Sequence, residues 1–71
     1  MDEFIQGLIR IQKERGWTDG DMAEQIHISR QWYIAIRQGK AKPSIRILRN
    51  ISLAFPSLSM YVRQIIDAMF K

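Results

Sequence analysis

The sequence predicts an all-α fold, a small domain of five short helices. Apolar residues recur with a helical period in most segments, and no segment shows the alternation of a β-strand. Glycines, prolines and cap residues separate these segments. The chain has 71 residues with 46% hydrophobic content, which is enough for one packed core, so we expect a single domain over residues 1–71. With no cysteine and one histidine, disulfides and a structural zinc site are excluded.

The first predicted helix covers residues 2–15. Phe4, Leu8 and Ile11 recur at the i, i+4, i+7 spacing of one helix face. Gly16 follows the last periodic residue and is a plausible C-cap.

Four further helices follow, each preceded by a residue that caps helix N-termini well. We expect them over residues 19–26, 30–38, 45–55 and 58–70. The predicted N-caps are Thr18, Ser29, Ser44 and Ser57. Asp21 completes a weak form of the capping box with Thr18, and Gly39 and Pro56 end the third and fourth helices.

The helical periods also predict which side chains face the core. Tyr33 and Ile36 share one face of the third helix. One face of the fourth helix carries Ile45, Leu48, Ile51 and Phe55. In the fifth helix the core-facing set is Leu58, Tyr61, Val62, Ile65 and Met69, which leaves Met60, Ile66 and Phe70 outside.

Charge is distributed unevenly along the chain. Residues 1–26 hold six acids and three bases, a net charge of −3, whereas residues 27–71 hold eight bases and one acid, a net charge of +7. No acid occurs between His27 and Ile66. A solvated surface usually mixes both signs, so this half of the chain predicts an anionic partner.

Residues 19–38 have the pattern of two helices that cross steeply. Met22 and Ile26 are one turn apart, and Ala23 is small enough for close helix approach. A three-residue turn with apolar Ile28 then leads to the capped third helix, whose inner residues fill the elbow.

This stretch resembles the phage-repressor and Cro-type helix-turn-helix domain, the Xre family, and the resemblance extends over about the whole chain. The matching features are Met22-Ala23, Ile26, Ile28-Ser29, Tyr33, Ile36, Gly39, the Lys40 to Pro43-Ser44 loop and Ile51-x-x-Ala54-Phe55. The resemblance implies a lambda-repressor-like domain that binds double-stranded DNA with its third helix in the major groove. It implies a small transcriptional regulator, or repressor, in the cytoplasm with the nucleoid, and no cofactor.

The face of the third helix opposite its core residues supplies the candidate base contacts. These are Arg30, Gln31, Ile34 and Ala35, of which Arg30 suits guanine, Gln31 suits adenine and the apolar pair suits thymine methyl groups. The candidate backbone contacts are Lys40, Lys42 and Arg46, with Thr18 and Trp32.

Several residues have alternative interpretations. Trp32 could instead pack at the domain edge, and with Ile34 it could anchor a protein partner, which gives a protein-interaction module as the alternative function. Asp19 lies where the family often has a neutral phosphate-contacting residue, and we expect it to stabilise the helix dipole. Arg37 replaces a common acid and adds to the basic face. His27 lies where the family usually has glycine and is expected to be a structural turn residue.

The fifth helix, over residues 58–70, has more apolar surface than one core stripe requires. Met60, Ile66 and Phe70 either enlarge the core or form a homodimer interface that would double the DNA contact. The sequence predicts no enzyme, because it has no cysteine nucleophile, histidine pair or phosphate-binding glycine loop. It also predicts no signal peptide and no membrane association.

Overall fold

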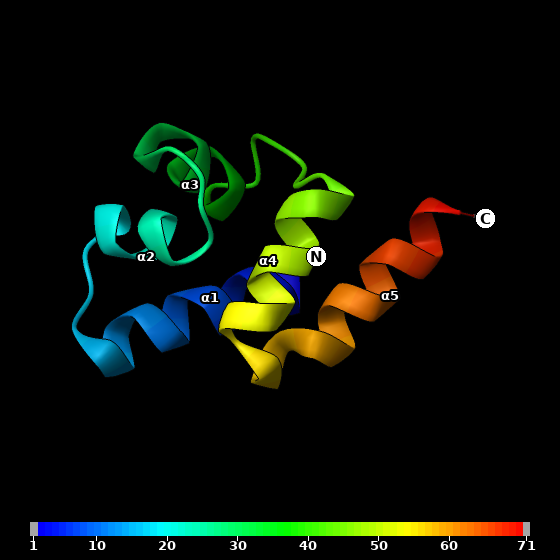
Figure 1. Ribbon diagram of the computed structural model, residues 1–71, viewed down its shortest axis with the longest axis horizontal. Helices are drawn as coiled ribbons and strands as arrows, with labels where there is room; N and C mark the ends of the chain where they lie inside the picture. The colour runs from blue at the N-terminus through cyan, green and yellow to red at the C-terminus, as the bar shows by residue number, and fades with distance from the viewer. Residues whose placement is uncertain (1, 71) are drawn as a thin grey trace.

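A computed structural model describes residues 2–70 and shows five α-helices with one short 3-10 helix, which confirms the all-α fold (Figure 1). No strand occurs among these residues. The elements are α1 (Asp2–Arg15), α2 (Asp19–Gln25), α3 (Arg30–Arg37), α4 (Ile45–Ala54), η1 (Pro56–Leu58) and α5 (Ser59–Met69). The predicted bounds of α1 are confirmed, and α2, α3 and α4 each end one residue before the predicted end, because that residue is the C-cap.

Three of the four predicted N-caps are confirmed. Thr18 Oγ1 accepts from the Asp21 amide at 3.1 Å while Asp21 Oδ2 accepts from the Thr18 amide at 3.0 Å, a complete capping box. Ser29 and Ser44 accept from the third amide of α3 and of α4. The prediction for Ser57 is wrong: Pro56 opens the 3-10 turn directly after α4, so Ser57 lies inside η1 and α5 begins later.

One hydrophobic core joins all the helices. The fully buried large side chains are Phe4, Leu8, Met22, Ile26, Tyr33, Ile36, Leu48, Ile51 and Phe55. Close packing extends to Gly7, where an added Cβ would lie 2.5 Å from Leu58 Cδ2, so glycine permits α1 to contact η1.

The predicted core faces need three corrections. Ile45 is 38% exposed because it is the first residue of α4, and Met69 is 51% exposed at the end of α5. Figure 1 shows why: the C-terminal part of α5 extends beyond the other helices. Ile66, in contrast, is partly buried against the core.

The corner between α1 and α2 carries an aromatic cluster. The Trp17 and Phe55 ring centroids are 6.3 Å apart, and the Arg15 guanidinium lies 4.8 Å from the Trp17 centroid. The same guanidinium lies 5.5 Å from the Phe55 ring centroid, so the cluster joins the end of α1 to the end of α4. No helix among residues 2–70 is long and apolar enough to span a membrane.

Candidate nucleic-acid interface

The turn between α2 and α3 sets the angle between these two helices. His27 has a φ of 61°, the left-handed conformation that glycine adopts most easily, and its exposed side chain confirms it as a turn residue. The Ile28 amide then donates to the Ala23 carbonyl at 3.0 Å. Asn50 of α4 donates from Nδ2 to the Ile26 carbonyl at 3.2 Å, so a third helix holds the turn in place.

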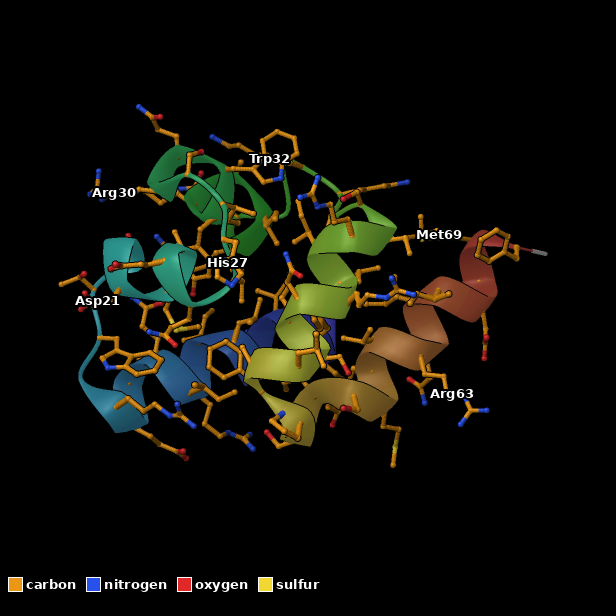
Figure 2. All side chains as sticks on the ribbon, in the orientation of Figure 1. Asp21, His27, Arg30, Trp32, Arg63 and Met69 are labelled. Atoms are coloured by element: carbon orange, nitrogen blue, oxygen red, sulfur yellow. The ribbon has the colours of Figure 1, made fainter. Side chains whose placement is uncertain are left out.

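The first turn of α3 is the most exposed part of that helix. Tyr33 and Ile36 are buried, as predicted, whereas Arg30, Gln31 and Trp32 are exposed. Figure 2 shows Arg30 and Trp32 projecting from α3 away from the body of the domain. The helix therefore presents its N-terminal residues to solvent, while Tyr33 and Ile36 anchor its opposite face in the core.

The other two candidate base contacts are less accessible. Ile34 and Ala35 are both partly buried. The Ala35 carbonyl accepts from the Lys40 amide at 2.9 Å and from the Ala41 amide at 3.2 Å, which ties the following loop to this part of α3.

The loop from α3 to α4 carries the candidate backbone cations. Lys40 and Lys42 are exposed, and so is Arg46 in the first turn of α4. Pro43 is buried and anchors the loop between them. Lys42 lines a shallow cavity with Met69 and other residues of α5, so its side chain lies on the α5 side of the loop.

The start of α2 lies beside the start of α3. A Cβ added at Gly20 would be 3.9 Å from Arg30 Cδ, so the aliphatic stem of Arg30 passes the first turn of α2. Thr18 is exposed at this place and its hydroxyl proton is free to donate, since Oγ1 acts only as acceptor in the capping box.

Asp19 and Arg37 form an ion pair, which corrects the prediction that Arg37 adds to the basic face. Arg37 Nη2 lies 3.2 Å from Asp19 Oδ2, with side chains 29% and 21% exposed. Gln12 Nε2 donates to the other oxygen, Asp19 Oδ1, at 3.0 Å. The carboxylate at the start of α2 is therefore neutralised by Arg37, in addition to its place near the positive end of the helix dipole.

Tyr33 extends this network into the core. Its hydroxyl donates to Gln12 Oε1 at 2.7 Å, and burial raises the pKa of Tyr33 to about 12. The phenol therefore remains a proton donor at neutral pH. The network links α1, α2 and α3 through side chains alone.

Sequence reasoning missed this network and the Asn50 contact. One signal was present: Asp19 and Arg37 both depart from the family pattern, and with opposite signs. Two opposite charges at positions that depart from the family pattern are consistent with an ion pair. They lie eighteen residues apart in the sequence, so local spacing gives no sign that they are in contact. Among the described residues no cluster of three or more histidine or acidic side chains could hold a metal ion.

Comparison with known proteins agrees with this geometry. A family model described as helix-turn-helix matches residues 8–62, which is most of the chain. The chain therefore belongs to this helix-turn-helix family, and the resemblance to phage-repressor-type domains is confirmed. The family is of the DNA-binding, transcription-regulator type and is typically non-enzymatic. The chain matches no curated protein and no solved structure.

Proposed function

We propose that this protein is a sequence-specific double-stranded DNA-binding regulator of transcription that inserts α3 into the major groove. The observation that carries the proposal is the capped first turn of α3. It projects Arg30 and Gln31 outward, while Tyr33 and Ile36 fix the opposite face of the helix in the core. Recognition helices of this type read bases with their N-terminal residues.

The side chains on this surface have the chemistry for base readout. Arg30 can donate two hydrogen bonds to guanine O6 and N7, and Gln31 can pair with adenine N6 and N7. Ile34 and Ala35 are partly buried, and their remaining exposed surface is apolar, which suits contact with thymine methyl groups.

The backbone contacts are proposed on both sides of α3. Lys40, Lys42 and Arg46 are exposed cations on the loop and the start of α4, and the part of the chain that holds them has no acid to neutralise them. Thr18, the N-cap of α2, and Trp32, in the first turn of α3, are exposed on the other side. Such contacts fix the register of the protein on the duplex without reading its sequence.

A homodimer through α5 completes the proposal. Met60 and Phe70 are 69% and 74% exposed, so the two ends of α5 present large apolar side chains to solvent. Ile66 is partly buried and lines a groove between α5 and α4, so the proposed interface rests on Met60 and Phe70. Two-fold pairing would let the protein read two half-sites. We place the regulator, acting as a repressor, in the cytoplasm on the nucleoid.

Selection of bound sequences from random double-stranded DNA tests the function. We expect an enriched half-site, repeated with two-fold symmetry. The affinity for mixed-sequence DNA should fall steeply with salt, with a log–log slope near −0.9 per phosphate, for about 4–6 phosphates. No binding at low salt would contradict the proposal.

A protein-interaction module is the second candidate, because the large apolar side chain of Trp32 is 42% exposed in the first turn of α3. In that case Trp32→Ala would abolish partner binding, and no DNA sequence would be enriched. Enrichment of one DNA sequence by wild-type protein separates the two candidates.

A further inference from the structure

An open groove of about 450 Å³ lies between α4 and α5, outside the surface proposed for DNA. From α4, Ile45 and Arg49 line it, and from α5, Val62, Arg63 and Ile66 do so. Figure 2 shows Arg63 on the far side of the domain from Arg30 and Trp32. An occupant of this groove would leave α3 free.

The floor of the groove is mainly apolar. Val62 is only 3% exposed, Ile66 is partly buried, and Ile45 retains 38% exposure at the rim. Ser52 and Ser59 bring hydroxyl groups to the groove, but their Oγ atoms lie 3.0 Å apart and hydrogen-bond to each other. The groove therefore suits one large apolar side chain better than a polar one.

Each of the two helices that form the groove contributes one arginine to its lining. Arg49 and Arg63 are both exposed, and among the side chains that the structure describes, those of residues 3–70, the one ion pair joins Asp19 to Arg37 elsewhere. The sequence has no acid from His27 to Ile66, and Asp67, four residues after Arg63, makes no ion pair with it. Both guanidinium groups are thus available for carboxylates, which they bind in two-point geometry.

We propose that this groove binds an acidic peptide segment of a partner protein. One large apolar side chain of the segment enters between Ile45, Val62 and Ile66, and flanking carboxylates pair with Arg49 and Arg63. The charges argue for a different protein chain as the occupant. A second copy related by two-fold symmetry would place its own Arg49 and Arg63 near those of the first copy, where like charges repel. Asp67 is the one acid in residues 27–71 that could offset this repulsion. Nucleic acid would match the charge but leave the apolar floor uncovered.

The test is selection of short random peptides displayed on phage against the wild-type protein. We expect enriched peptides with one aromatic or large aliphatic residue between aspartates and glutamates. The synthetic form of the most enriched peptide is then titrated into isotope-labelled protein, where the amide signals of Ile45, Val62 and Ile66 should shift. The charge reversals R49E and R63E, made together, should weaken this peptide at least tenfold. Arg10→Glu, which reverses an exposed arginine on α1, should leave its affinity unchanged.

Five outcomes would overturn the proposal. They are the absence of any enriched acidic peptide, signal shifts confined to α3, and equal affinity of the R49E and R63E protein for the peptide. The fourth is a loss of self-association in that protein, which would make a second copy the occupant. Shifts of Ile45 and Val62 on addition of mixed DNA would assign the groove to nucleic acid instead. The wild-type titration stands even if the charge-reversed protein does not fold.

Discussion

Arg30 is the first helical residue of α3, and its exposed side chain leads away from the domain beside the start of α2. We expect Arg30→Ala to relax specificity at one base pair, at a cost of about 1–3 kcal/mol there. Affinities for a selected site and its single-base variants, measured at fixed salt, check this. Lys40→Ala is the matched control and should weaken all sequences equally. The same uniform loss from Arg30→Ala would make Arg30 a phosphate contact.

The pair formed by Asp19 and Arg37 gives a second prediction for single residues. Arg37→Met removes the cation and leaves a partly buried carboxylate at the start of α2. We expect a loss of about 1 kcal/mol in the free energy of unfolding and weaker DNA binding, because the bare carboxylate repels phosphate. Adding Asp19→Asn should restore much of the DNA affinity.

Urea unfolding of the two single variants and the double variant measures their coupling. We expect a coupling of about 0.5–1 kcal/mol, since both side chains are less than a third exposed. Strictly additive single effects, together with unchanged DNA affinity in Arg37→Met, would show that the pair has no role in either property.

At the scale of elements, the turn between α2 and α3 contains a strained residue. His27 adopts a φ of 61°, which costs an L-residue about 1 kcal/mol relative to glycine. We therefore expect His27→Gly to raise the free energy of unfolding by about 0.5–1 kcal/mol, as measured by urea denaturation. Gln38→Gly is the control, because Gln38 has a φ of −83° and gains no relief. Destabilisation by both changes would show that the His27 side chain contributes more than its backbone strain costs.

The elements also show what the sequence could predict. Local signals were sufficient for the helices and for three caps, because a cap depends on a side chain and an amide three residues away. Ser57 has the same local chemistry, but the prediction that it caps α5 was wrong, because Pro56 starts a 3-10 turn that includes Ser57. The contact of Asn50 with the turn and the pairing of Asp19 with Arg37 depend on tertiary packing, for which the sequence period gives no signal.

At the scale of the whole molecule, the charge pattern becomes a surface pattern. Asp19 pairs with Arg37, and Asp21 accepts a hydrogen bond from the Thr18 amide in the capping box. Two of the six acids in residues 1–26 therefore have partners within the fold. The exposed cations of the loop after α3 and of α4 and α5 have no such partners among the described ion pairs. The net charge of +4 therefore understates the positive potential that a partner meets.

The exposed apolar side chains of Met60 and Phe70 predict a homodimer that pairs through α5. Met60→Glu in the first turn of α5 and Phe70→Glu at its C-cap place two charges on exposed positions, so we expect the monomer to remain folded. Self-association in sedimentation equilibrium should fall, and affinity for a two-fold symmetric site should drop by about tenfold or more, while a single half-site is bound as before. Leu53→Glu on α4 is the control, since Leu53 is 77% exposed but lies outside α5. If the α5 variant kept both its self-association and its affinity for the symmetric site, the two copies would have to pair through another surface, and the exposed ends of α5 would need a different explanation.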